Sequence, residues 1–138
     1  MRQALHRLTV NTTGQGLVDV TDEVSRWVGE QAIKIGLLTI WCRHTSASLL
    51  VQENADADVR ADLEAFFRSL VPEHAGYQHE DEGPDDMPAH IKSALTQTQL
   101  TIPVDEGKLL LGTGQAIYLF EHRAAPHGRE LALHVIGD

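Results

Sequence analysis

The fourteen residues from His79 to Lys92 hold the densest group of chemically active side chains in the sequence. They include two imidazoles and five carboxylates but almost nothing apolar, so the segment cannot help to build a core. His79 and His90 flank a loop that can fold back, and both imidazoles could then bind one metal ion. A borderline metal such as zinc takes three or four ligands, with one position open for catalysis. The spacing matches no standard zinc motif, and a solvated acidic loop is the alternative interpretation.

A second polar segment, His44 to Ser48, follows a strongly apolar run. Its small hydroxyl side chains leave room for a ligand close to the backbone, where amides and hydroxyls could hold a phosphate. His44 could act there as acid, base or ligand. A serine nucleophile is disfavoured because no G-x-S-x-G pattern is present. The alternative is a serine-rich corner between strands with a hydrogen-bonded histidine.

Glu121, His122 and Arg123 follow another apolar run and are expected at the end of a rigid strand. His122 could supply a third metal ligand there. Arg123 could bind phosphate through two parallel hydrogen bonds, which its planar guanidinium favours. The alternative is a strand end that simply enters a polar turn.

Two further polar groups are less specific. Asp58 and Asp62 are four residues apart on an expected helix, and with Asn54 they could bind a hard cation or orient histidines. A solvated helix face is the simpler interpretation. The glycine-rich stretch 112–115 has neither dinucleotide-binding nor P-loop spacing, so we expect a bend or bulge in a strand.

The elements that must position these side chains are mostly strands. Residues 35–43 form a near-continuous apolar run, as expected of a strand that is buried on both faces. Alternating apolar residues and turn signals predict the others. The expected strands are 2–13, 17–20, 35–43, 46–52, 99–103, 108–112, 115–122 and 129–136.

Helices are expected between these strands. The clearest covers residues 56–70, where apolar side chains form one stripe at helical spacing. An earlier helix is predicted to begin at Thr21 or Asp22 as its N-cap. A short one is predicted to begin at Asp86 as its N-cap and to carry His90.

Length and composition limit the class of protein. The 138 residues suit a single domain, 1–138, of the α+β class with a mostly antiparallel sheet and two or three helices on one face. A formal charge of −9 argues against nucleic-acid binding, which needs a basic face. No apolar run approaches the roughly 20 residues that span a bilayer. The lone Cys42 cannot form an internal disulfide, so we expect a reducing, cytoplasmic location.

Several of these segments occur together, in this order, in one known family. They are His44-Thr45-Ser46-Ala47-Ser48, Asn54, Asp58 with Asp62, Asp85-Asp86-Met87-Pro88-Ala89-His90-Ile91-Lys92, Gly112-Thr113-Gly114-Gln115 and Glu121-His122-Arg123. The chain resembles the secondary thiamine-phosphate synthase family, the YjbQ-like proteins, essentially from end to end. One position departs, because Gly114 stands where the family usually has tryptophan. Loss of that indole opens space or removes a stacking surface.

The resemblance implies a small α+β fold with a curved mixed sheet, assembled as a homotrimer. It also implies weak thiamine-phosphate synthase activity, which joins a hydroxymethylpyrimidine diphosphate to a thiazole phosphate and releases pyrophosphate. The expected cofactor is a divalent metal ion, with zinc and magnesium as candidates. The family's polar cluster corresponds here to His44, His79, Asp86, His90 and His122.

The residues and the resemblance together give the expected roles. The expected metal ligands are His79, His90 and His122. The expected catalytic residues are His44, Asp86 and Arg123. The expected substrate-binding residues are Thr45, Ser46, Ser48, Asn54, Lys92, Thr113 and Gln115. The expected partner is a small phosphorylated metabolite, not nucleic acid or a membrane. Two other functions remain open: a metal- or phosphometabolite-binding protein without turnover, and a metal-dependent hydrolase.

Overall fold

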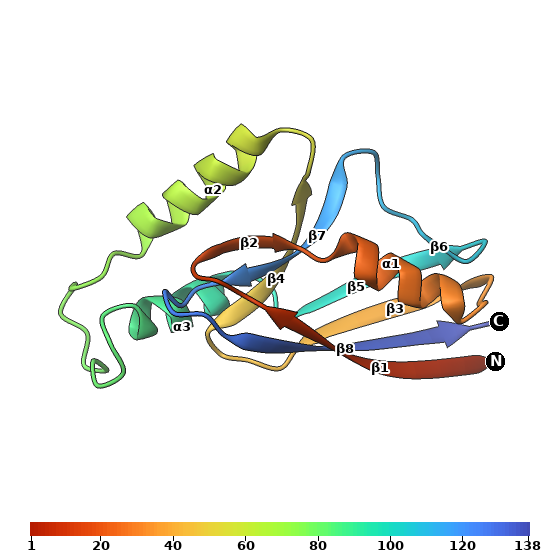
Figure 1. Cartoon of the computed structure of the whole chain (residues 1–138), viewed down its shortest axis with the longest axis horizontal. Coiled ribbons are helices and arrows are strands. Elements are labelled where there is room, and N and C mark those ends of the chain that lie inside the picture. Colours follow the sequence, from red (N-terminus) through yellow and green to blue (C-terminus); the bar gives the residue numbers. More distant parts are fainter.

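Two antiparallel sheets form the frame of the protein in the computed structural model, which describes residues 1–138 (Figure 1). The larger sheet has the strand order β1-β8-β3-β5-β6 and the smaller one β2-β7-β4. Every pairing is antiparallel, so the α+β class is confirmed, without parallel strands. The strands are β1 (Arg2–Asn11), β2 (Gly16–Asp19), β3 (Ile35–Cys42), β4 (Ala47–Glu53), β5 (Gln99–Asp105), β6 (Lys108–Leu109), β7 (Gln115–Glu121) and β8 (Gly128–Gly137).

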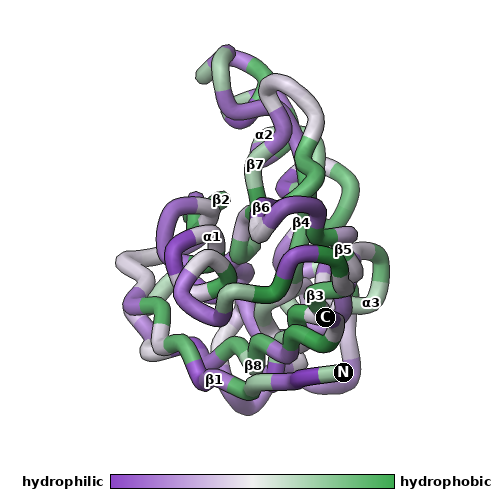
Figure 2. Tube along the Cα trace, turned by 90° about the vertical axis from the view of Figure 1, so that its right-hand side faces the viewer, coloured by the Kyte–Doolittle hydropathy of each residue, from purple (hydrophilic) through white to green (hydrophobic).

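The main core lies between the larger sheet, the smaller sheet and α1 (Thr21–Glu30). Side chains alternate across a strand, and every second residue therefore points inward. Leu38 and Ile40 of β3 and Leu133 of β8 are fully buried in this way. Helix α1 buries Val24 and Val28, four residues apart, against them. Figure 2 shows the same alternation of apolar and polar residues along β1.

The other face of β3 is not covered within the single chain. Ile35, Leu37 and Trp41 are 69%, 40% and 48% exposed, and Leu5 of β1 on the same face is 66% exposed. The prediction that residues 35–43 are buried on both faces is therefore wrong for one chain. The larger sheet packs on only one side, and its opposite side, the outer face, carries these four apolar residues.

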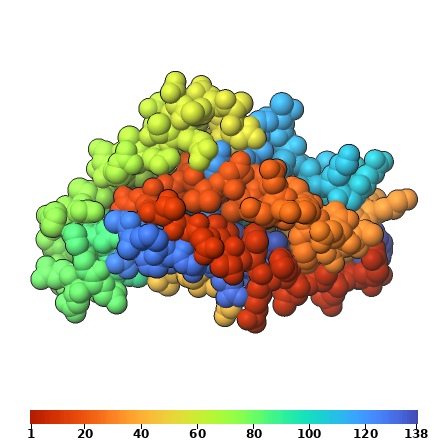
Figure 3. Space-filling model, in the orientation of Figure 1, coloured from red at the N-terminus to blue at the C-terminus, as the bar shows by residue number.

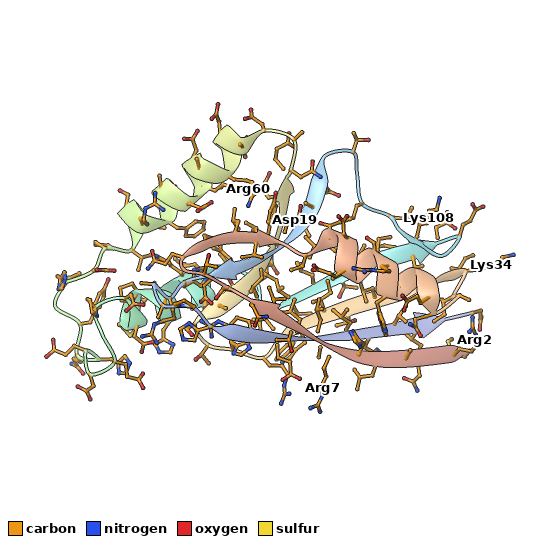
Figure 4. All side chains as sticks on the ribbon, in the orientation of Figure 1. Arg2, Arg7, Asp19, Lys34, Arg60 and Lys108 are labelled. Carbon is orange, nitrogen blue, oxygen red and sulfur yellow. The ribbon has the colours of Figure 1, made fainter.

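Helix α2 (Ala57–Leu70) lies on the far side of the smaller sheet (Figure 1). Leu63 and Phe67 pack on a second, smaller core contributed by β2 and β7. Phe66 and Leu70 belong to the predicted stripe but remain more than half exposed. Arg60 points to β2 and donates from Nη2 to a β2 carbonyl at 2.7 Å (Figure 4). The predicted helix is confirmed, although only part of its apolar stripe is used. No helix of the protein is long and apolar enough to cross a membrane.

The helix starts differ from the prediction by one residue. Asp85, not Asp86, is the N-cap of α3 (Asp86–Leu95), and its carboxylate bonds to a neighbouring segment instead of the helix. Asp86 is the first helical residue, so its side chain is available for the site. In α1 the N-cap is Val20, and the Thr21 hydroxyl accepts from the backbone N–H of Ile117 in β7 at 2.8 Å. Here tertiary partners take over the capping side chains.

Candidate metal centre and adjoining pocket

His79, Asp86 and His90 meet at the first turn of α3. Nε2 of His79 lies 2.6 Å and Nε2 of His90 lies 3.1 Å from the same carboxylate oxygen, Oδ2 of Asp86. The three ligand atoms all lie within 4.8 Å of one another. Asp86 and His90 share one face of α3 because they are four residues apart. The loop between α2 and α3 brings His79 back to Asp86. In the space-filling view the green segment that contains this loop and α3 gathers at one end of the molecule (Figure 3).

The bonding of His90 shows that this group suits a cation. Its Nδ1 lies 3.0 Å from the carbonyl oxygen of Thr45, which can only accept, so Nδ1 carries a proton. In the neutral imidazole, Nε2 then turns a lone pair towards the Asp86 carboxylate. Two such acceptors repel unless a proton or a cation lies with them. Two imidazoles and one carboxylate are also a ligand set that zinc takes in catalytic sites. The residues present therefore fit a divalent metal ion.

The Asp86 carboxylate is charged although it is only 3% exposed. Burial works to raise its pKa, but hydrogen bonds, first of all from His79, lower the pKa overall. The same hydrogen bond raises the pKa of His79. The second carboxylate oxygen, Oδ1, accepts from Nη1 of Arg123 at 2.7 Å. A fixed negative charge therefore lies between the two imidazoles.

Arg123 bonds to the protein on the side of Asp86 opposite the two imidazoles, and its guanidinium does not face a substrate. Its Nε donates to Asp85 at 2.9 Å, its Nη1 to Asp86, and its Nη2 to the carbonyl of Glu82 at 2.8 Å. Each of the three guanidinium nitrogens therefore already donates to the protein. The structure does not support the predicted role of Arg123 as a phosphate partner. The side chain instead fixes the loop before α3 to the end of β7.

The structure does not bring His122 to this cluster. Its imidazole is buried, Nε2 lies 2.8 Å from Oγ of Ser48, and Nδ1 has no partner. Burial and then the charge of Lys92 lower the pKa of His122 to about 3. Asp86 takes the third position that the sequence assigned to His122.

Lys92 also turns away from the metal centre. It is two residues beyond His90 on α3, and residues two apart point to opposite sides of a helix. The side chain is 5% exposed and lines a small cavity together with His122. Burial, followed by the nearby charge of Arg68, lowers the pKa of Lys92. It is therefore not placed to bind a substrate at the candidate metal centre.

An open pocket of about 750 Å³ adjoins the cluster at His90. The predicted residues His44, Thr45 and Ser46 line it, whereas Ser48 is buried behind it. Nε2 of His44 accepts from the backbone N–H of Glu130 at 2.8 Å. Burial lowers the pKa of His44, so the ring is neutral with its proton on Nδ1. The other lining residues are Trp41, Cys42, Arg43, Ser93, Ala94, Thr98 and Arg129.

Sequence reasoning missed several of these lining residues. Trp41 and Thr98 come from strand ends that carry no recognisable motif. Ser93 lies on α3 one turn after His90, a relation that helical spacing could have revealed. Cys42 is inert, because burial raises the pKa of its thiol to about 11.

A buried ion pair supports the wall of the pocket. Glu121 is fully buried and accepts from Thr12 Oγ1 at 2.7 Å and from Arg129 Nε at 2.8 Å. Arg129 Nη2 also donates to Oγ of Ser46 at 3.0 Å. A second Glu121 oxygen accepts from the backbone N–H of Arg123. The pair therefore joins the pocket to the segment that holds Asp86, a link that the sequence did not suggest.

Asn54, Thr113 and Gln115 form a separate group at the opposite end of β7. The backbone N–H of Asn54 donates to the Gly114 carbonyl at 2.9 Å. At about 3.3 Å per residue, β7 separates this group from Glu121 by roughly 20 Å. The three residues therefore do not adjoin the candidate metal centre within one chain. Asp58 and Asp62 are exposed on α2 and belong to no metal-binding group.

Gly114 has a structural reason to differ from the family pattern. Its φ of +83° lies in the left-handed region, and a Cβ there would come 2.9 Å from Oε2 of Glu53. The turn before β7 thus favours glycine, and the indole expected from the family is replaced by a tight turn.

These features define a small α+β protein of two antiparallel sheets with a histidine–carboxylate cluster at one end. The family model described as UPF0047 protein YjbQ-like matches residues 6–138, and the chain belongs to this family. It is 49% identical over 138 residues to a UPF0047 protein of Synechocystis, covering 99% of this chain and 94% of that one. It is 42% identical over 132 residues to YjbQ of Escherichia coli O157:H7, covering 95% and 96%.

Solved structures share the same fold. A YjbQ/UPF0047 family protein of Clostridium acetobutylicum has a TM-score of 0.88 at 32% identity, over 95% of this chain and 99% of that one. A protein of Thermus thermophilus has a TM-score of 0.85 at 33% identity, over 95% and 99%. The expected YjbQ-like fold is therefore confirmed.

Proposed function

We propose that this protein is a metal-dependent transferase that acts on a small phosphorylated metabolite, of the thiamine-phosphate synthase type. The observation that carries the proposal is the cluster of His79, Asp86 and His90 beside a pocket of about 750 Å³. A diphosphate leaving group gathers negative charge as its bond breaks, and catalysis requires that this charge is stabilised. A divalent ion, zinc or magnesium, would supply that stabilisation when bound.

The protein's own residues have distinct tasks in this proposal. His79 and His90 present their Nε2 atoms, and Asp86 holds both rings and completes the ligand set. Thr45 fixes the His90 ring through its carbonyl. His44 offers its Nδ1–H to a bound substrate as a hydrogen-bond donor. Arg123 positions Asp86 and does not touch the substrate.

A homotrimer is part of the proposal. The outer face, with Leu5, Ile35, Leu37 and Trp41, leaves apolar surface in water that a second copy would bury. Trp41 also lines the pocket, so a subunit boundary on this face would pass close to the site. Light scattering of the purified protein at micromolar concentration should return three times the mass of one chain. A monomer would contradict this part of the proposal.

Product formation tests the reaction directly. Purified protein with zinc or magnesium is given hydroxymethylpyrimidine diphosphate and thiazole phosphate, and thiamine phosphate is measured. His90→Ala should abolish turnover, because it removes one ligand and the contact with Thr45. His6→Ala is the matched control, since that imidazole stacks on Trp27 of α1, on the opposite side of the larger sheet from the outer face. Full activity of His90→Ala would place the chemistry elsewhere.

Two rival functions use the same residues. A binding protein would take up metal and gain thermal stability from phosphorylated ligands without forming product. A metal-dependent hydrolase would instead release product from generic phosphoester or ester substrates. Metal content, thermal shift and a hydrolase panel on the same preparation separate the three functions.

A further inference from the structure

Glu82 places a further carboxylate at the edge of the candidate metal centre. Its Oε2 lies 3.5 Å from Nε2 of His79, the nitrogen that also faces Asp86 at 2.6 Å. A contact of 3.5 Å is too long for a good hydrogen bond, and a ring nitrogen has only one proton to donate. The Glu82 carboxylate therefore lies beside the cluster with no cation of its own.

The backbone of Glu82 is fixed, whereas its side chain is free to turn. The carbonyl accepts from Nη2 of Arg123 at 2.8 Å, so the residue stays next to the cluster. The side chain is 64% exposed, so water surrounds most of it. A carboxylate mounted in this way can reach the cluster or leave it by rotation about its own single bonds, without movement of the loop.

The distances around His79 suit a shared cation. Zinc binds nitrogen and oxygen at roughly 2.0–2.2 Å, so two ligands at the corners of a tetrahedron lie roughly 3.3–3.6 Å apart. The 3.5 Å between Glu82 and His79 falls in this range. Glu82 is outside the group of three whose ligand atoms all lie within 4.8 Å of one another. Its carboxylate therefore has to turn inward to complete a set of four.

Charge gives this carboxylate a reason to turn inward. The Asp86 charge is already shared with Arg123, which donates to Oδ1 at 2.7 Å. A divalent ion held by Asp86 and two neutral imidazoles would therefore keep an excess of positive charge. A second carboxylate beside the ion offsets this excess. A bound phosphate would offset it equally well and would compete with Glu82 for the open position.

We propose that Glu82 is an exchangeable fourth metal ligand, which takes the open position of the ion when the pocket is empty and yields it to an anionic ligand. The inference rests on the metal centre of the proposed function, but not on the substrate or the reaction. Exchange of one anionic oxygen for another keeps the coordination number and the local charge nearly constant.

Zinc affinity tests the ligand role. Glu82→Gln removes the charge and keeps the shape, and should weaken zinc binding about tenfold or more in a titration against a competing chelator. Glu80→Gln is the matched control, because Glu80 is an exposed carboxylate of the same loop. It should change zinc affinity far less. Equal affinities of the two variants would overturn the proposal and leave the metal centre of three residues standing. Absence of zinc binding by the unchanged protein would overturn both.

Phosphate binding tests the exchange. The zinc-loaded Glu82→Gln variant should bind inorganic phosphate several-fold more tightly than the zinc-loaded unchanged protein, because phosphate no longer competes with a carboxylate. Glu80→Gln should not have this effect. Equal changes in the two variants would assign the effect to general charge and overturn the exchange.

Cobalt in place of zinc gives a second readout, because its visible absorption depends on the ligands. The spectra of the unchanged protein and of Glu82→Gln should differ without phosphate. They should coincide when phosphate is saturating, because the same anion then holds the fourth position in both. Spectra that are identical without phosphate, or that still differ when phosphate is saturating, would overturn the proposal.

Discussion

At the scale of single residues, three side chains fix the position of the Asp86 carboxylate. Its Oδ1 bonds to Arg123 and its Oδ2 faces both imidazoles, so the carboxylate cannot rotate without breaking contacts on both sides. Groups that orient metal ligands from behind typically matter almost as much as the ligands. Arg123 orients Asp86 in this way, and its bonds to Asp85 and Glu82 fix the guanidinium itself.

Arg123→Gln should therefore weaken the proposed zinc binding about 10- to 100-fold, the usual effect of losing such a supporting group. The measurement is a zinc titration against a competing chelator. Arg7→Gln is the control, because Arg7 is exposed on β1 (Figure 4) and pairs with Glu130, not with a residue of the cluster. Equal zinc affinity of Arg123→Gln and the unchanged protein would contradict the supporting role.

His122 should make stability depend on pH above the range of the carboxylates. Its folded pKa of about 3 lies below the ordinary value of 6.5, so the unfolded chain takes up the proton first as pH falls. Stability from this group is complete above pH 6.5 and is lost as pH falls towards 3. Since one pKa unit corresponds to about 1.4 kcal/mol, roughly 2 kcal/mol should be lost between pH 7 and pH 5.

Urea unfolding at pH 7 and pH 5 measures this loss. His44, whose pKa is also lowered, contributes in the same direction, so a variant is needed to isolate His122. His122→Phe removes the titrating group and should make the loss about 2 kcal/mol smaller. The same pH dependence in His122→Phe would assign the effect to other groups.

At the scale of elements, the end of β7 joins the site to the core. Glu121 is the last residue of β7, and its carboxylate accepts from Arg129 at the start of β8. Arg129 also donates to Ser46, and Glu121 also accepts from the backbone N–H of Arg123. Two strands and two loops therefore meet at this one ion pair.

Glu121→Ala should destabilise the protein by about 3–5 kcal/mol, because it leaves the Arg129 charge buried without a partner. Glu130→Ala is the matched control. Glu130 pairs with Arg43 and Arg7 near the surface, and such pairs are worth less than about 1 kcal/mol. Denaturant midpoints of the two variants give the comparison. Similar losses in both would mean that burial of Glu121 does not matter.

At the scale of the whole molecule, one chain leaves two apolar surfaces open. The outer face carries Leu37 and Trp41, and α2 exposes Phe66 and Leu70. The outer face is part of a rigid sheet, whereas α2 packs through only one side of its stripe. The sheet is thus the better support for contact between copies.

Leu37→Lys should convert the proposed trimer to monomers, because each contact would have to bury an unpaired charge. Leu110→Lys is the control, since Leu110 is also more than half exposed but lies in the loop between β6 and β7. Light scattering at matched concentration reads out both variants. A trimer that survives Leu37→Lys would exclude the outer face as the contact.

The sequence alone was sufficient for the elements and for part of the site. Strand alternation and helical spacing are local, so β7, β8, α1 and α2 could be located to within a few residues. The pairing of His79 with His90 could also be predicted, because one short loop and one helical turn connect them.

Only the tertiary structure decided which distant residues share a site. It turned Lys92 and His122 to the far side of α3, put Asp86 in the third ligand position and used the Arg123 guanidinium internally. It also placed Trp41 beside His44. These outcomes depend on how strands far apart in sequence pair and on which polar groups burial forces together. Local periodicity carries no information on strand pairing or on the burial of polar groups. The sequence therefore predicted a cluster of histidines and carboxylates, but its members are known only from the packing.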